Sequence, residues 1–177
     1  MSKIIAFSGS NSGQSINQQF INATVPLFKG AEVEVIDLRD YPAPLYGIDL
    51  EMSEGIPASM QSLKEKLREA DGFLISSPEH NGSMPAVLKN TIDWLSRIEQ
   101  KVFDEKPTVF MSTSPGPRGG LSALDHLVTI MPYRGAKIVG SYSLGNFGEN
   151  VVDGVLSEEK KTELLPILNK LVNAVSV

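Results

Sequence analysis

The stretch that decides the fold is KIIAFSGSNSGQSIN, residues 3–17. It begins with a short apolar run, residues 3–8, of the kind found in strands covered on both faces. A turn of hydroxyl, amide and glycine residues follows, and Ser15 with Gln18 predicts a capping box at the start of a helix. A buried strand, a polar turn and a helix in this order are typical of open α/β sheets, which bind ligands at the carboxyl ends of their strands.

A second stretch repeats this arrangement. It is FLISSPEHNGSMP, residues 73–85, in which an apolar run precedes a wide turn stiffened by two prolines. Gly82 permits a close backbone approach, and His80 and Asn81 offer polar groups to the edge of a flat ring. Because the first turn suits a phosphate and the second suits a ring, the two together predict a mononucleotide ligand.

Strand and helix patterns alternate along the chain and predict a single domain over residues 1–177. The strands are expected at residues 3–8, 32–37, 73–76, 108–112 and 137–141. The helices are expected from residue 15 to 27, over 56–70, 85–96 and 121–131, and from 157 to 175. The segment 38–54, rich in Pro, Tyr and Asp, is expected to be irregular. These patterns predict a doubly wound, five-stranded parallel sheet with helices on both faces.

The expected strand order is 2-1-3-4-5. Residues 32–37 alternate charged and apolar side chains, which predicts a half-exposed strand at an edge of the sheet. In this arrangement the strand order reverses between strands one and three, and the two polar turns follow these two strands. Sequence chemistry and topology therefore indicate the same crevice.

Composition excludes several classes of function. The chain has 177 residues, a net charge of −5, no cysteine and two histidines. The lack of cysteine excludes disulfides, thiolate metal sites and thiol catalysis, and two histidines are too few for a histidine-built metal site. The negative charge argues against nucleic acid or an anionic membrane as partner. Without an apolar stretch of transmembrane length or a leader, we expect a cytoplasmic protein.

The first turn carries none of the common nucleotide or nucleophile signatures. It has no Gly-Lys-Ser/Thr and no Gly-x-Gly-x-x-Gly, and Asn11 stands where a nucleophile elbow needs serine. Backbone N–H groups at a helix start bind a phosphate without a lysine or arginine. An ordinary turn with Ser15 as a helix cap is the alternative. The candidate side-chain donors are Ser8, Ser10, Ser12, Ser15 and Asn17.

The longest motif runs from residue 77 to residue 97. It reads SPEHNGSMP at 77–85, LKN at 88–90, IDW at 92–94 and SR at 96–97. Here the chain resembles the NADPH-dependent FMN reductase family, a flavodoxin-like group that includes quinone, azo-dye and chromate reductases. The family's typical form is S-P-E-Y-N-G-S-x-P, then L-K-N-x-I-D-W-x-S-R. Matches at Gly9-Ser10, Ser15, Asn17, residues 37–40 and Gly119-Gly120 extend the resemblance over nearly the whole chain.

The resemblance implies a flavodoxin-like fold, FMN as cofactor and NADPH or NADH as reductant. It implies that the first turn holds the FMN phosphate, that the second runs along the ring largely through its backbone, and that the loop after strand four closes the other side. The expected cofactor-binding residues are Ser10, Ser12, Ser15, Ile16, Asn17, Pro78, Glu79, His80, Asn81, Gly82, Ser112, Thr113, Ser114 and Gly119. It further implies a homodimer or homotetramer with helix 84–96 in its interface, where Trp94 and Leu95 are either contacts or core residues.

The chain departs from the family pattern at three positions. Ser12 stands where many relatives carry an arginine, which removes a charge-assisted contact to the phosphate and predicts weaker FMN binding. His80 replaces the usual tyrosine at the edge of the ring site. Arg118 precedes the glycine pair, where relatives often place an arginine after it. Arg118 and Arg39 either steer a nicotinamide phosphate or are solvated surface residues.

The function predicted is that of an FMN-dependent NAD(P)H oxidoreductase whose chemistry is carried by FMN, with no catalytic residue. Hydride passes from reduced nicotinamide through FMN to a small-molecule acceptor: a quinone, azo compound, metal oxyanion or free flavin. One shared site predicts ping-pong kinetics. The alternatives are a flavin-bound electron carrier, or a flavodoxin-fold ligand-binding or regulatory protein without reductase activity. His126 is expected to be structural, and residues 41–46 are a candidate lid or oligomer contact.

Overall fold

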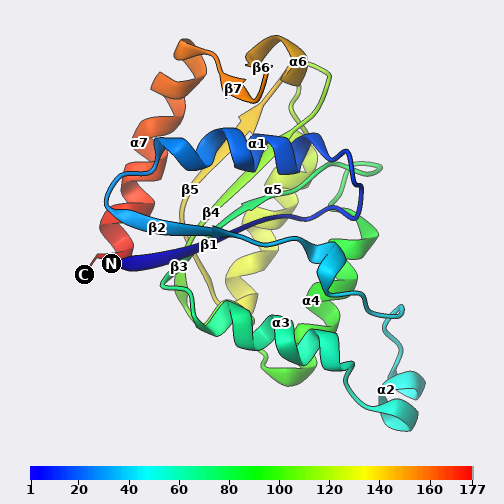
Figure 1. The fold of residues 1–177 in the computed structure, drawn as a ribbon. Coiled ribbons are helices and arrows are strands. Elements are labelled where there is room, and N and C mark those ends of the chain that lie inside the picture. The colour runs from blue at the N-terminus through cyan, green and yellow to red at the C-terminus, as the bar shows by residue number, and fades with distance from the viewer. Residues whose placement is uncertain (177) are drawn as a thin grey trace.

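The computed structural model describes residues 1–176 (Figure 1). Its centre is a five-stranded sheet in the order β2-β1-β3-β4-β5, and each neighbouring pair of strands is parallel. The strands are β1 (Ser2–Ser8), β2 (Ala31–Val35), β3 (Gly72–Ser76), β4 (Lys106–Thr113) and β5 (Ala136–Leu144). The predicted order and the flavodoxin-like, doubly wound class are confirmed.

Helices cover both faces of the sheet (Figure 1). One face carries α1 (Ile16–Thr24) and α7 (Glu158–Val175), and the other carries α3 (Ala58–Arg68), α4 (Ala86–Ile98) and α5 (Leu121–Ile130). Two apolar clusters fill the spaces between these layers, one on each face. Among the described residues, no helix combines the length and the apolar character that crossing a membrane requires.

The alternation of side chains along β1 explains why there are two clusters. Ile4 and Ala6 belong to the cluster under α1 and α7, whereas Ile5 and Phe7 belong to the cluster under α3, α4 and α5. Both faces of β1 are therefore apolar, as the continuous run predicts. Edge strand β2 is half-exposed and alternates with charged residues, as its pattern predicts.

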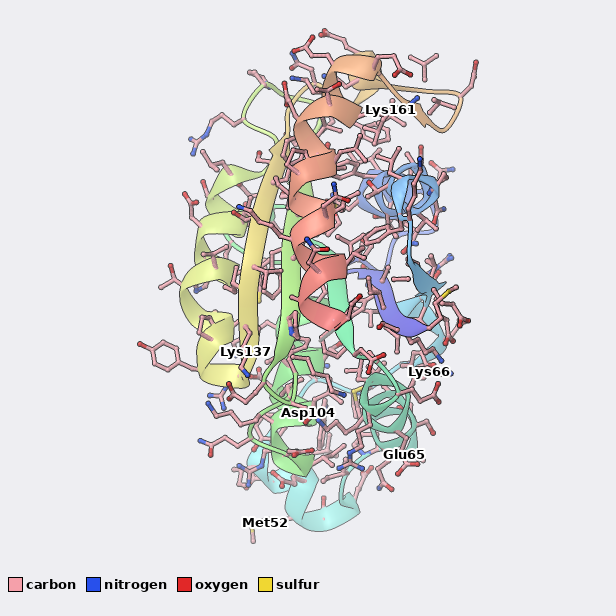
Figure 2. The ribbon with its side chains drawn as sticks, turned by 90° about the vertical axis from the view of Figure 1, so that its left-hand side faces the viewer. Met52, Glu65, Lys66, Asp104, Lys137 and Lys161 are labelled. Atoms are coloured by element: carbon pink, nitrogen blue, oxygen red, sulfur yellow. The ribbon has the colours of Figure 1, made fainter. Side chains whose placement is uncertain are left out.

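The segment 38–54 is more regular than expected. It contains a 3₁₀ turn at Leu38–Asp40 and the short helix α2 (Ile48–Glu54), which ends at Gly55 with a φ of 77°. The prediction of an irregular segment is confirmed for residues 41–47 and wrong for Leu38–Asp40 and Ile48–Glu54, because such short helical pieces show no apolar periodicity. Met52 of α2 points away from the body of the molecule (Figure 2).

Two other elements differ from expectation. The first helix ends at Thr24 instead of Leu27, since Pro26 favours the 3₁₀ turn Val25–Leu27. After β5 the chain forms α6 (Phe147–Asn150) and a small hairpin of β6 (Val151–Val152) and β7 (Val155–Leu156), neither of which was expected. The signal for the hairpin is Asp153-Gly154, where both residues have positive φ, as a tight two-residue turn requires.

Candidate functional site

Three loops meet at the carboxyl edge of the sheet. They are residues 9–15 after β1, residues 77–85 after β3, and residues 114–120 after β4. Backbone hydrogen bonds fix their starting points, because Gly9 N–H donates to the Ser76 carbonyl and Ser77 N–H to the Met111 carbonyl, both at 2.9 Å. The crevice predicted where the strand order reverses, between β1 and β3, is therefore bordered by loops from three adjacent strands.

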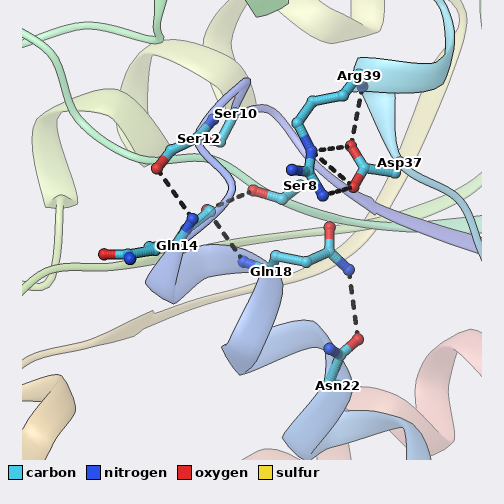
Figure 3. Close-up of polar contacts among 9 residues, drawn as sticks. Ser8, Ser10, Ser12, Gln14, Gln18, Asn22, Asp37 and Arg39 are labelled. Carbon is cyan, nitrogen blue, oxygen red and sulfur yellow. Dashed lines mark hydrogen bonds and ion pairs between the residues drawn. The ribbon is translucent and has the colours of Figure 1, made fainter.

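The first loop is shaped by its own hydroxyl groups (Figure 3). Ser10 Oγ accepts from Ser12 N–H at 3.1 Å, and Ser12 Oγ accepts from Gln14 N–H at 3.2 Å. Ser15 Oγ accepts from Gln18 N–H at 3.2 Å, which confirms the predicted cap. The other half of the capping box is wrong, since the Gln18 amide donates to Asn22 Oδ1 at 3.3 Å instead of returning to Ser15.

Several backbone donors of this loop have no acceptor in the protein. Within residues 1–176, the N–H groups of Gly13, Ile16 and Asn17 make no hydrogen bond. Ile16 and Asn17 are the first residues of α1, where the helix dipole also favours an anion. The arrangement therefore fits a phosphate group. A polar groove of about 610 Å³ borders the loop on the side of β2, between α1 and residues 34–41.

The side chain of Asn17 makes hydrogen bonds to β3 and β4 that the sequence did not predict. Its side chain is buried, accepts from Ser76 Oγ at 2.7 Å and Thr113 N–H at 3.1 Å, and donates to the Thr113 carbonyl at 3.1 Å. One amide thus ties α1 to β3 and β4 directly behind the loop. The Asn17 donor left for a ligand is its backbone N–H.

The second loop is built around a two-residue turn. His80 N–H donates to the Ser83 carbonyl at 2.9 Å, and Ser83 N–H donates back at 3.2 Å. Asn81 and Gly82 between them have φ of 53° and 78°, which a type I′ turn demands and which Asn-Gly adopts readily. The Asn-Gly pair is therefore explained by backbone geometry, and His80 and Asn81 are left exposed at the tip.

Two side chains fasten this turn to α5. Glu79 Oε2 accepts from the N–H groups of Ser122 and Ala123 at 2.9 and 3.3 Å, so the carboxylate caps the start of that helix. Ser83 Oγ lies 2.8 Å from His126 Nδ1, which gives His126 the structural contact expected of it. Both contacts orient the backbone of the turn, while neither side chain is free for a ligand.

Buried hydroxyl groups at the end of β4 hold the start of the third loop in place. Ser112 Oγ donates to the Ser77 carbonyl at 2.8 Å, and Thr113 Oγ1 donates to the Leu144 carbonyl at 2.7 Å. Gly119 and Gly120 have φ of 60° and 74°, and a side chain on Gly120 would collide with Ser112 Oγ. The glycine pair is thus required for this loop to close against β4. Ser114, whose Oγ donates to the Gly116 carbonyl at 3.1 Å, lies half-exposed at the start of the loop.

The motif on α4 borders this edge where Leu88 lies against Gly9, and its polar side chains bind the segment around residues 44–46. Asn90 accepts from Tyr46 N–H at 2.7 Å and donates to the Pro44 carbonyl at 3.0 Å, and Trp94 Nε1 donates to the same carbonyl at 2.8 Å. Residues 41–46 are therefore fixed to α4, which argues against a freely moving lid. Trp94 and Leu95 are completely buried, so they are core residues and not interface contacts.

Comparison with known proteins identifies the family of the chain. The model of the family described as NADPH-dependent FMN reductase matches residues 2–149. The chain belongs to this family. Over 132 residues it is 37% identical to a quinone reductase of Escherichia coli, with 73% of this chain and 70% of that protein covered. Over 179 residues it is 33% identical to an NADPH:quinone oxidoreductase of Arabidopsis thaliana, covering 93% and 89% of the two chains.

A solved structure gives the same result for the fold. FerB, a flavoenzyme NAD(P)H:(acceptor) oxidoreductase from Paracoccus denitrificans, superposes with a TM-score of 0.80 at 26% identity, covering 99% of this chain and 98% of that one. Family membership makes the protein an oxidoreductase that uses FMN and NAD(P)H. The chain's residues fit FMN, since the first loop offers unpaired donors to a phosphate and the second offers a rigid exposed backbone.

Proposed function

We propose that the protein transfers reducing equivalents from NAD(P)H to a small-molecule acceptor, with quinones as the leading class and azo compounds, metal oxyanions and free flavin as further members. When bound, FMN accepts hydride from the reduced nicotinamide and delivers electrons to the acceptor. The observation that carries the proposal is the set of unpaired N–H groups at Gly13, Ile16 and Asn17 next to two rigid loops. The two quinone-reducing relatives support the choice of acceptor.

The proposed roles divide the site residues into three groups. Ser10, Ser12, Ser15, Ile16 and Asn17 hold the phosphate, Asn17 through its backbone. Pro78, Glu79, His80, Asn81 and Gly82 line the ring edge through their backbone, and the Glu79 carboxylate keeps that backbone in place. Ser112 and Thr113 at the end of β4, with Ser114 and Gly119 of the loop that follows, close the other side, and the buried Ser112 and Thr113 hydroxyls support it.

We also propose that reductant and acceptor use one site in turn, which gives ping-pong kinetics. The side chains of Glu79 and His126 are engaged with α5 and Ser83, so neither serves as a general acid. Water then supplies the protons that reduction of a quinone consumes. Steady-state rates measured at several quinone concentrations should give parallel double-reciprocal lines against NADPH.

The visible spectrum of the purified protein tests the function directly. It is recorded before and after FMN, then after NADPH or NADH under argon, and finally after a benzoquinone. We expect flavin bands that bleach with the reductant and return with the quinone. Bands that persist with both reductants would favour the electron carrier, and a protein that takes up no FMN would favour the ligand-binding or regulatory protein.

Large apolar side chains are exposed on the segment around α2, which bears on how the protein assembles. We place the protein in the cytoplasm as a single-domain chain over 1–177 that forms a homodimer or homotetramer. Leu45, Ile48 and Met52 support assembly, because these large apolar side chains are 81%, 53% and 81% exposed on the protruding segment around α2 (Figure 1). Light scattering should give a multiple of the 19.2 kDa chain mass, and Met52→Glu should lower that multiple.

A further inference from the structure

The first loop lacks a cation of its own. Residues 9–17 contain no lysine and no arginine. N–H groups and a helix dipole hold a phosphate dianion, but a charge-assisted contact is about twice as strong as a neutral hydrogen bond. A cationic side chain within reach of the loop would therefore strengthen the binding of a phosphate.

Arg39 lies against this loop although it follows a different strand. A Cβ placed on Gly13 would stand 3.0 Å from Arg39 Nη1. Arg39 is also the one cationic side chain among the residues that line the 610 Å³ groove beside the loop. In Figure 3 the guanidinium lies next to the loop that carries Ser10 and Ser12.

Asp37 fixes the guanidinium in place. Arg39 Nε donates to Asp37 Oδ1 and Oδ2 at 3.1 and 2.9 Å, and Nη2 donates to Oδ2 at 2.6 Å. The same carboxylate accepts from Arg39 N–H at 2.9 Å, which closes the turn after β2. Within residues 1–176 Nη1 has no acceptor, so the edge of the planar fork that faces Gly13 is unoccupied.

Of the carboxylates that line the groove, Asp37 offsets part of the Arg39 charge but leaves Nη1 free to donate. Glu34 is bound by Lys3 at 2.6 Å and by Lys66 at 3.2 Å. Asp37 is engaged by Arg39, and the hydrogen bonds from Arg39 hold the pKa of Asp37 below its ordinary value. Asp40 is exposed to solvent, which weakens its field, although that field still reaches Arg39.

We propose that Arg39 binds the 5′-phosphate of FMN through Nη1, and so supplies from the β2 side the positive charge that residues 9–17 lack. This inference rests on the proposed placement of the phosphate at the first loop. It makes Arg39 a cofactor-binding residue and Asp37 its positioning residue. It also means that the serine at position 12 does not leave the phosphate without a cationic partner.

The test compares FMN with riboflavin, which has the same ring and no phosphate. Flavin fluorescence titrations give both dissociation constants for the wild-type apoprotein and for Arg39→Gln. We expect Arg39→Gln to bind FMN about tenfold more weakly, from the loss of one charge-assisted contact, and riboflavin within about twofold of wild type.

Arg68→Gln is the matched control. Arg68 is exposed to the same degree as Arg39, 50% against 49% of the side chain, and is likewise paired with a carboxylate, but it lies on α3. It should change neither constant. In the Arg39→Gln background, Ser12→Arg should restore the preference for FMN, because it puts a guanidinium back beside the loop.

The outcomes separate this inference from the proposed function. A wild-type protein that binds neither flavin overturns the proposed function. A wild-type preference for FMN that Arg39→Gln leaves unchanged overturns only the role of Arg39. Equal weakening of FMN and riboflavin also overturns that role, since it reports a local structural change. A variant altered only in its KM for NADPH would assign Arg39 to the reductant and overturn the contact with FMN.

Discussion

Lys64 at the amino end of the sheet and the start of α1 at its carboxyl end differ in whether the protein supplies acceptors for their donors. At the amino end, Lys64 is completely buried, yet its ammonium donates to the Val102 carbonyl at 2.9 Å and to Asp104 at 2.7 Å, and pairs with Glu99 at 3.0 Å. At the carboxyl end, the N–H groups of Ile16 and Asn17 have no acceptor within residues 1–176. Donors matched inside the protein stabilise the fold, and donors without a match are available to a ligand.

The unmatched N–H groups at the carboxyl end do not reflect poor packing of the interior. Within the described residues, every buried side-chain nitrogen and oxygen has a hydrogen-bond partner. At the carboxyl edge, the unmatched donors include the backbone N–H groups of Gly13, Ile16 and Asn17, together with Nη1 of Arg39. Stability and ligand binding are therefore expected to respond to different substitutions at the two ends.

The largest effect should follow from removing the buried cation. Lys64→Met leaves the Val102 carbonyl and Asp104 without their donor, so the free energy of unfolding should fall by about 3 kcal/mol. Urea unfolding measures this loss, and FMN affinity should stay at the wild-type value. Lys66→Met is the control: its ammonium is partly exposed and its ion pairs should contribute at most about 1 kcal/mol. Equal losses in the two variants would contradict this account of the amino end.

Asn17→Ala should affect both stability and binding. It removes the hydrogen bonds to Ser76 and Thr113 behind the first loop, at an expected cost of about 2 kcal/mol. Because the loop loses its anchor, FMN should also bind more weakly. Asn22→Ala, on the exposed side of the same helix, should change neither quantity. Unaltered FMN affinity in Asn17→Ala would show that the loop holds its shape without this amide.

Glu79→Gln should have a smaller effect, about 1 kcal/mol in unfolding free energy, because a neutral amide caps α5 less well than a carboxylate. The ring-edge turn should loosen at the same time, which amide hydrogen exchange at His80 and Ser83 would report as faster. Glu159→Gln in the first turn of α7 is the control, as its side chain is 76% exposed. If the exchange rates at His80 and Ser83 were the same as in the wild type, the Glu79 carboxylate would not be what holds the turn in place.

The smallest effect is expected on the stability of the protein at low pH. Hydrogen bonds from Lys3 and Lys64 lower the pKa of Glu34 and Glu99 below the ordinary value of 4.5. Since the folded pKa is depressed, this stabilisation is fully present above pH 4.5 and is lost as the pH falls through the lowered values. Urea midpoints should thus be level from about pH 7 to 5 and decline below about 4.5, with a shallower decline in Glu34→Gln. If the urea midpoint of Glu34→Gln declined as steeply as that of the wild type, the loss of stability in acid would come from groups other than Glu34.

The sequence predicts those parts of the molecule that depend on local pattern. Continuous apolar runs located the strands, the alternation at 32–37 placed β2 at the edge, and the polar turns after β1 and β3 marked the crevice. Contacts between segments that are distant in the sequence could not be predicted from such local patterns. The side chain of Asn17 meets Thr113 through packing, and Arg39 approaches Gly13 because β1 and β2 are neighbours. The motif at 77–97 predicted the family, while the contacts by which Asn90 and Trp94 hold residues 44–46 became visible only in three dimensions.

The central claim is that the unmatched donors at the carboxyl end bind the phosphate of FMN. Amide resonances of the apoprotein followed by NMR during an FMN titration test it most directly. The account predicts that the N–H groups of Gly13, Ile16 and Asn17 shift and become protected from hydrogen exchange, while the amides around Lys64 stay unchanged. Saturating FMN binding that leaves these three amides as they were would contradict it.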